Sequence, residues 1–226
     1  METLLQLDHP FTFACGPELP CFTVCCSDLD LLLTPYDLLR LQRRLGLSSE
    51  QFLAGYTERQ LRERVGLPLL FLRMREDEKK SCPFLTPRGC AVYSDRPLSC
   101  RLYPLGLVPP GSEAGFRGEE FLVIAEPHCE GHRAGRTWPV REWLADQCPG
   151  DYLELGREFN RLCFDLKLRE QPLTLEPREI FYTVAYNRDR FRKRICENGR
   201  PEPPTDDPAF LRFALSRLRS PKGSEL

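Results

Sequence analysis

Helical periodicity dominates the second half of the chain. Apolar residues recur there every three or four positions, the spacing that places them along one face of a helix. Gly199 is a typical helix end, and the proline-rich segment 201–204 separates the last helix from the rest. The predicted helices are residues 139–147, 151–169, 176–198 and 207–219. The sequence therefore predicts a mainly helical C-terminal region.

Two further helices are predicted in the first half by their start signals. Thr34 is a suitable cap for the first helix, Pro35 suits its first turn, and Gly46 follows its last turn. The second helix opens at Ser48, and Gln51 stands three residues further on, which is the spacing of a capping box. Both helices are therefore expected to begin at defined residues.

Strands in the first half are short and loops are long. Gly and Pro interrupt residues 15–26 and 82–100, so both segments are expected to be loops. The charged run 75–80 is expected to be an exposed turn. Extended segments or short strands are predicted at residues 1–14, 67–75, 91–93 and 121–125. Together these elements predict an α+β fold, in which an irregular, cysteine-rich domain with short strands precedes a mainly helical region.

The change of pattern along the chain suggests three parts. Residues 1–135 are expected to form the cysteine-rich domain, and residues 136–200 a helical region packed on it. Residues 201–226 are expected to form a proline-rich linker and a terminal amphipathic helix. We expect this last helix to be separable from the remainder, because the linker isolates it in the sequence.

Charge and hydropathy exclude several classes of protein. The formal net charge is −1, whereas a dedicated nucleic-acid-binding protein would normally show a basic excess. No segment approaches the roughly 20 apolar residues that a membrane span needs. The first eight residues carry two acidic and no basic side chains, so no signal peptide is expected. The protein is therefore expected in the cytoplasm.

Cysteine is unusually frequent and unevenly placed. The chain has 11 cysteines, and an odd number in a reducing compartment argues against a disulfide framework. Cys148, Cys163 and Cys196 are scattered among apolar residues and are expected to lie in the core. The other eight all precede residue 130: Cys15, Cys21, Cys25, Cys26, Cys82, Cys90, Cys100 and Cys129. Thiols crowded in this way in a cytoplasmic protein are typical of metal ligands.

The spacing of these thiols gives two dense groups with no cysteine between them. The groups are Cys15-x5-Cys21-x3-Cys25-Cys26 and Cys82-x7-Cys90-x9-Cys100. Side chains of chain neighbours usually point apart, so Cys25 and Cys26 either serve two metals or only one of them is a ligand. The wide spacings of the second group favour an iron–sulfur cluster over zinc, whose closed sites use Cys-x2–4-Cys turns. Two zinc ions remain the alternative.

Polar residues beside the cysteines have two interpretations each. Arg96 and Arg101 either donate hydrogen bonds to thiolate sulfurs, as cofactor-binding residues, or form surface ion pairs. His128 and His132 bracket Cys129, and a histidine there either completes a metal site or is solvated.

Short motifs around both cysteine groups resemble the YkgJ-like cysteine-cluster family. They are Phe13-Ala14-Cys15, Cys25-Cys26, Leu33-Thr34-Pro35-Tyr36-Asp37, Cys82-Pro83-Phe84-Leu85, Gly89-Cys90-Ala91-Val92-Tyr93 and Arg96-Pro97-Leu98-Ser99-Cys100-Arg101-Leu102-Tyr103-Pro104. The resemblance covers about residues 11–130 and implies a zinc- or iron-chelating domain. The family commonly opens with Cys-x-x-Cys-x-x-Cys-Cys, so the first loop is looser here. Related domains occur in flagellin lysine N-methylases.

Three functions are compatible with these patterns. The first is a metal-binding protein with cysteine thiolate ligands, carrying an iron–sulfur cluster or zinc. The second is a metal-dependent protein-modifying enzyme, which the resemblance to methylases suggests. The third is a zinc-stabilised, non-catalytic adaptor whose C-terminal helices bind a protein partner.

Overall fold

The computed structural model describes residues 4–61, 66–108, 120–167, 175–198 and 202–219. The chain divides into two compact units, which are not contiguous in sequence. Unit 1 comprises Met1–Leu31 and Arg73–Gly150, and unit 2 comprises Leu32–Leu72 and Asp151–Leu226. Short strands accompany the helices, so the expected α+β class is confirmed. The sequential division at residues 135 and 200 stays a prediction.

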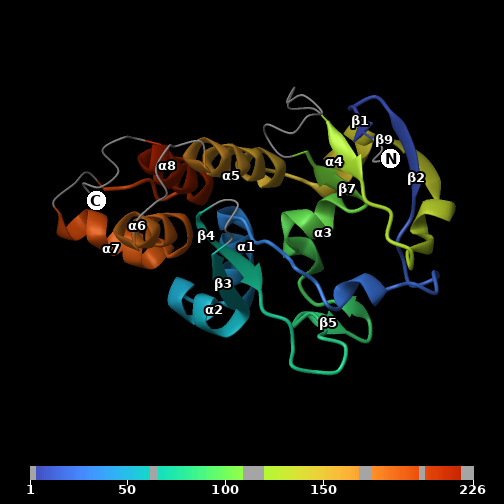
Figure 1. Ribbon diagram of the computed structural model, residues 1–226, viewed down its shortest axis with the longest axis horizontal. Coiled ribbons are helices and arrows are strands. Elements are labelled where there is room, and N and C mark those ends of the chain that lie inside the picture. The colour runs from blue at the N-terminus through green and yellow to red at the C-terminus, as the bar shows by residue number, and fades with distance from the viewer. Residues whose placement is uncertain (1–3, 62–65, 109–119, 168–174, 199–201, 220–226) are drawn as a thin grey trace. The chain divides into compact units, whose positions relative to one another are not determined.

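Unit 1 consists of short strands and short helices (Figure 1). Its strands are β1 (Leu4–Leu5), β2 (Pro10–Phe13), β5 (Leu85–Thr86), β6 (Gly89–Cys90), β7 (Leu105–Leu107), β8 (Phe121–Val123) and β9 (Arg136–Pro139). Its helices are α3 (Leu98–Leu102), α4 (Val140–Gln147) and the 3₁₀ helices η1 (Val24–Cys26), η2 (Tyr93–Asp95) and η3 (Glu130–Arg133). All pairings are antiparallel: β1, β8 and β7 form one sheet, β2 pairs with β9, and β5 pairs with β6.

Two of the predicted elements of unit 1 are confirmed and one is wrong. The strand expected at 121–125 and the helix expected at 139–147 are β8 and α4. The strand expected at 91–93 is replaced by the β5–β6 hairpin and by η2. Gly89 takes φ +106°, a backbone conformation that glycine adopts readily, and its carbonyl accepts a hydrogen bond of 2.7 Å from the Thr86 hydroxyl. The turn therefore lies between Thr86 and Gly89, and the described pairing extends from it only as far as Leu85 and Cys90.

Aromatic side chains form the core of unit 1. The Phe13 ring, 2% exposed, lies 5.5 Å from the Trp143 ring and 5.7 Å from the Tyr103 ring in edge-to-face contacts. The indole of Trp143 donates to the Leu102 carbonyl over 3.0 Å, and that of Trp138 donates to the Phe13 carbonyl over 3.1 Å. These contacts fix the end of β2 two residues before Cys15, where the first cysteine loop begins.

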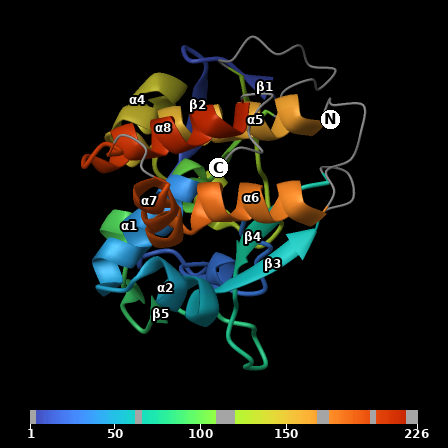
Figure 2. The same cartoon turned by 90° about the vertical axis from the view of Figure 1, so that its left-hand side faces the viewer.

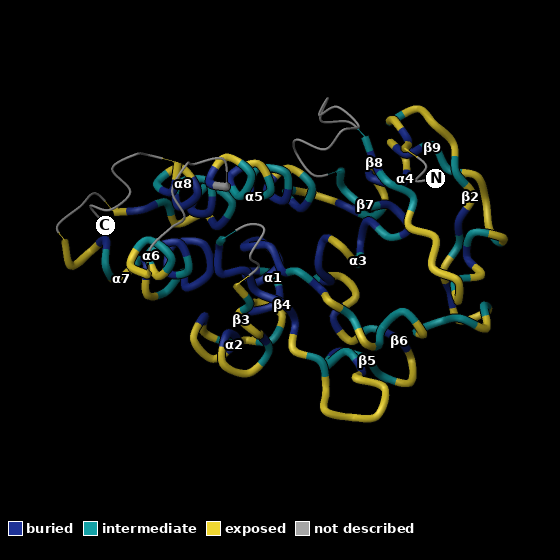
Figure 3. Tube along the Cα trace, viewed as in Figure 1, coloured by how far each residue is buried: buried dark blue, intermediate teal, exposed yellow. Residues whose placement is uncertain are grey.

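Unit 2 is mainly helical, with one two-stranded antiparallel sheet. Its elements are α1 (Pro35–Leu45), α2 (Ser49–Tyr56), β3 (Thr57–Leu61), β4 (Pro68–Leu72), α5 (Tyr152–Lys167), α6 (Leu175–Tyr186), α7 (Arg188–Glu197) and α8 (Asp207–Arg219). Every residue of β4 is buried, whereas the loop 75–80, assigned to unit 1, is exposed as expected (Figure 3). The strand expected at 67–75 is thus confirmed in a shorter form. Among the described residues, no helix combines the length and the apolar character that crossing a membrane requires.

The helix starts in unit 2 follow the predicted signals with one exception. The side chains of Thr34 and Ser48 each complete a capping box, so α1 and α2 begin where expected. The helix predicted over 176–198 is two helices, because the Asn187 side chain accepts a hydrogen bond from the Arg190 amide and caps α7. The expected end of α5 at 168–169, the helix end at Gly199, and Pro201 of the linker lie outside the described residues.

The last helix, α8, belongs to the core of unit 2. Figure 2 shows α8 lying alongside α5, and α8 also contacts α6 and α1. Phe210, Leu211, Ala214, Leu215 and Leu218 are all buried. The linker isolates α8 in the sequence, but its apolar face packs on neighbouring helices, and its expected separability stays a prediction.

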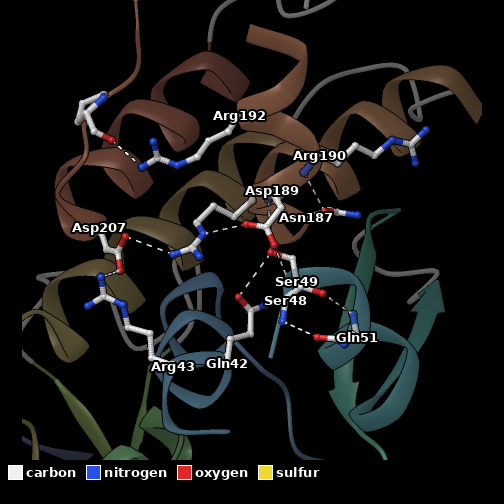
Figure 4. Close-up of polar contacts among 12 residues, drawn as sticks. Gln42, Arg43, Ser48, Ser49, Gln51, Asn187, Asp189, Arg190, Arg192 and Asp207 are labelled. Carbon is white, nitrogen blue, oxygen red and sulfur yellow. Dashed lines mark hydrogen bonds and ion pairs between the residues drawn. The ribbon is translucent and has the colours of Figure 1, made fainter. Parts of the chain in front are cut away.

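A polar network at one end of unit 2 joins four helices (Figure 4). The Asp207 carboxylate, 5% exposed, is ion-paired with Arg43 of α1 and, over 3.2 Å, with Arg188 of α7. The Asp189 carboxylate of α7 accepts a hydrogen bond of 2.8 Å from the Ser49 amide at the start of α2. The Asp207 carboxylate thus balances two arginine charges, and the Asp189 carboxylate accepts from an amide in the first turn of α2. These contacts link α1, α2, α7 and α8.

Candidate metal centre

All eight cysteines singled out by their spacing lie in unit 1, where three chain segments supply them: 15–26, 82–100 and residue 129. Cys15 is exposed, and the other seven are half-buried. None of the cysteines that the structure describes takes part in a disulfide. Cys148 is buried, as expected of a core residue, whereas Cys196 lies exposed on α7 and its expected core position is wrong.

The start of the first cysteine loop contacts the segment that follows Cys129. The Ala14 amide donates to the Gly131 carbonyl over 3.1 Å, directly after the β2–β9 pairing. A Cβ atom on Gly131 would lie 2.4 Å from the Ala14 carbonyl oxygen, so only glycine allows this approach. The amide of Glu130 donates to the Cys21 sulfur over 3.3 Å. These contacts bring Cys129 next to the first half of the loop.

The end of the same loop contacts the segment that begins the second cysteine group. The Cys82 amide donates to the Cys26 carbonyl over 2.8 Å, and the Asp28 amide donates to the Lys80 carbonyl over 3.0 Å. The side chains of Asp28 and Lys80 also form an exposed ion pair at 2.9 Å. The two cysteine groups, distant in sequence, are therefore adjacent in the fold.

Backbone contacts also order the second cysteine group. Cys90 stands opposite Leu85 in the β5–β6 hairpin, and Cys100 lies on α3. The guanidinium of Arg75 donates to the carbonyls of Pro83 and Leu85 at 2.8 and 3.2 Å, which fixes the chain after Cys82. Three thiols are thus held by a loop, a hairpin and a short helix that follow one another closely.

The thiols influence one another electrostatically. Partial burial of the sulfur, followed by the charges of Cys25, Cys129 and Cys21, raises the pKa of Cys15 to about 11. A hydrogen bond with Cys25 is the main cause that raises the pKa of Cys26, and the charges of Cys82 and Cys100 add to it. The same bond lowers the pKa of Cys25. Such mutual effects require thiols that lie close together.

The arginines expected beside the cysteines are buried and bind the chain itself. Arg101, 3% exposed, donates to the carbonyls of Arg96, Gln147 and Ser94. Arg96, 8% exposed, donates to the Tyr93 carbonyl over 2.8 Å, stacks on the Tyr93 ring and contacts the Gln147 side chain. Burial raises the pKa of the Cys90 thiol, and the Val92 backbone and the Arg96 charge oppose that rise. Their burial argues against surface ion pairs, and their role as cofactor-binding residues stays a prediction.

Tyr103, part of the last family motif and expected to pack around the cysteine loops, is also a polar neighbour of the site. Its hydroxyl is buried and makes no hydrogen bond within the part of the chain that the structure describes. Burial, and then the Cys129 thiol, raise the pKa of Tyr103. A metal-bound thiolate at Cys129 would give this hydroxyl an acceptor. His132 contacts the Ile124 carbonyl at 3.0 Å and the Phe13 ring, so it has a role in packing.

The donor set fits a thiophilic metal in its chemistry. Zinc and iron both accept thiolate sulfur, and no other residue type recurs in these three segments with comparable density. Within the described ranges, no three His, Cys, Asp or Glu side chains gather closely enough to hold an ion as they stand. The fold therefore brings the ligand-bearing segments together, and metal binding would require the thiols themselves to converge.

Comparison with known proteins agrees with this interpretation. The model of a protein family named CxxCxxCC and described as "Putative zinc- or iron-chelating domain" matches residues 14–130, just over half of the 226 residues. No curated protein and no solved structure matches the chain. The matched range begins one residue before Cys15 and ends one residue after Cys129, so it encloses all eight cysteines.

Proposed function

The chain belongs to the CxxCxxCC family of zinc- or iron-chelating domains, and we propose that its thiolates hold an iron–sulfur cluster. The observation that carries this proposal is that hydrogen bonds hold together the three chain segments of unit 1 that bear the eight cysteines. Such thiols remain reduced in the cytoplasm, which is where we place the protein.

The chain geometry of the second cysteine group favours a cluster over a single zinc ion. Closed zinc sites usually draw two sulfurs from one tight turn, with two to four residues between them. Here Cys82, Cys90 and Cys100 come from a loop end, a hairpin and a short helix. A cluster is larger than one ion, and its irons accept thiolates that arrive from wider loops.

Buried positive charge in unit 1 also supports an anionic centre. Four thiolates bound to a divalent ion, or to a cluster, leave a negative charge that is costly to bury alone. The guanidinium groups of Arg96 and Arg101 are buried in the same unit. Burial raises the pKa of the Cys90 thiol, and the Arg96 charge opposes that rise. Buried cations near the thiols offset this cost.

Anaerobic purification from iron-replete cells tests the proposal. The protein is expected to be brown, to contain iron and acid-labile sulfide, and to bleach in air. The single variants Cys163→Ser and Cys196→Ser, whose thiols lie in unit 2, should keep the full iron and sulfide content. A colourless protein with stoichiometric zinc and no sulfide would overturn the choice of metal and leave thiolate binding intact.

A further inference from the structure

The first cysteine loop is held at its two ends by two different partners. At its start, the Ala14 amide and the Cys21 sulfur bond to Gly131 and Glu130, which immediately follow Cys129. This end of the loop is tied only to the Cys129 segment in the hydrogen bonds described above. Thiols in this half of the loop therefore share a neighbourhood with Cys129.

At its other end, the loop is tied to the second cysteine group. The Cys82 amide bonds to the Cys26 carbonyl, and an antiparallel bridge joins Ser27 to Ser81. A Cβ atom on Gly89 of the β5–β6 hairpin would lie 3.2 Å from the ring of Phe22, two residues before η1, so this part of the loop also contacts the hairpin that carries Cys90. Thiols at this end therefore share a neighbourhood with the 82–100 segment.

The division between the two neighbourhoods falls between Cys25 and Cys26. Both residues lie on η1 at the end of the loop, and the Cys26 carbonyl already accepts a hydrogen bond from the Cys82 amide.

We propose that the eight cysteines form two neighbouring four-thiolate centres rather than one. The first centre comprises Cys15, Cys21, Cys25 and Cys129, and the second comprises Cys26, Cys82, Cys90 and Cys100. This inference rests on the proposed function, because it assigns ligands for the metal that the family binds. The adjacent pair on η1 then supplies one ligand to each centre.

Each proposed centre has its own neighbouring polar group. The buried Tyr103 hydroxyl lies beside Cys129 of the first centre, where it can donate to a thiolate. Arg96, a buried cation, is the charged neighbour of Cys90 in the second centre. A neutral donor at one centre and a cation at the other would make the two centres differ in stability and in the release of metal.

Cysteine mapping on the wild-type protein tests the proposal without any variant. A chelator is added in steps to the metal-loaded protein, iodoacetamide labels each thiol that is released, and mass spectrometry locates the label. The first-centre thiols are expected to become reactive in one phase and the second-centre thiols in another. Simultaneous release of all eight thiols in a single phase would overturn the proposal.

Two double variants give an independent test by metal content. Cys15→Ser with Cys129→Ser, and Cys82→Ser with Cys90→Ser, should each retain about half of the wild-type metal, because each removes the ligands of one centre. Circular dichroism checks that each variant is folded. A folded double variant that loses all metal would overturn the two-centre proposal. The proposed function would still stand in that case if the wild-type protein binds metal through its thiolates. A wild-type protein without thiolate-bound metal would contradict both.

Discussion

Gly131 is the residue at which a single added methyl group should separate the first cysteine loop from Cys129. In Gly131→Ala the new Cβ would lie 2.4 Å from the Ala14 carbonyl oxygen and 2.7 Å from a carbon of the Phe13 ring. Both distances are far below ordinary carbon contacts of about 3.5–4.0 Å, so the two segments must move apart. The Ala14 oxygen is a backbone atom beside the β2–β9 pairing and cannot rotate away.

The cost of this overlap is estimated from overpacked cores. Forcing an extra methyl group into a packed site costs about 1–3 kcal/mol, and the backbone contact places this variant near the middle of that range or above it. A loss of about 2 kcal/mol corresponds to a fall of roughly 4–8 °C in the melting temperature of a chain of this size. Because Cys129 lies two residues before Gly131, the first centre should also lose metal.

Circular dichroism during heating measures the melting temperature, and metal analysis of the same samples measures the loss of metal. The matched control is Gly55→Ala on α2, where a Cβ meets nothing within 4 Å. This control should keep its metal and melt at or slightly above the wild-type temperature, since alanine favours a helix by up to about 1 kcal/mol over glycine. A Gly131→Ala protein that matches Gly55→Ala in both measurements would refute the close approach.

Three further predictions concern other groups. Asp207→Asn should lower the free energy of unfolding, measured by chemical denaturation, by about 1–3 kcal/mol, because it removes the buried negative charge that pairs with two arginines. The control Asp165→Asn, at an exposed ion pair, should change it by less than about 0.5 kcal/mol. Tyr103→Phe should speed chelator-driven loss of metal about 10-fold at an unchanged melting temperature, because the variant cannot donate a hydrogen bond to the Cys129 thiolate. A rate of metal loss equal to that of the wild type would argue against this hydrogen bond. In the metal-free protein the Cys15 pKa is raised from 9.0 to about 11, so the folded state favours the protonated thiol and should lose stability as the pH rises from 9 to 11. Cys15→Ser should reduce that loss, and a variant whose stability has the same pH profile as the wild type would contradict the raised pKa.

Local signals in the sequence were sufficient for elements whose ends are set by nearby side chains. The capping residues Thr34 and Ser48 predicted where α1 and α2 begin, since each cap bonds within its own first turn. The break at Asn187 was missed because apolar periodicity continues through it, although asparagine is itself a capping residue. β3 was also missed. Its exposed residues carry no alternating pattern, and its strand conformation depends on pairing with buried β4.

The candidate site could be predicted as a set of residues but not as an arrangement. Cysteine spacing identified the eight thiols, and all of them lie in unit 1. Their partition depends on contacts between residues far apart in sequence, such as Ala14 with Gly131 and Cys26 with Cys82. The packing position of α8 was missed for the same reason. A linker composition describes the chain locally and does not report what the next helix packs against.

X-ray absorption spectroscopy of the purified protein tests the central claim, that unit 1 holds its metal through cysteine thiolates. Spectra at the iron and zinc edges identify the bound metal and the atoms around it in the same sample. The account predicts a first shell of sulfur alone, at about 2.3 Å. A first shell dominated by nitrogen or oxygen, or a pure and folded protein with neither metal, would contradict it.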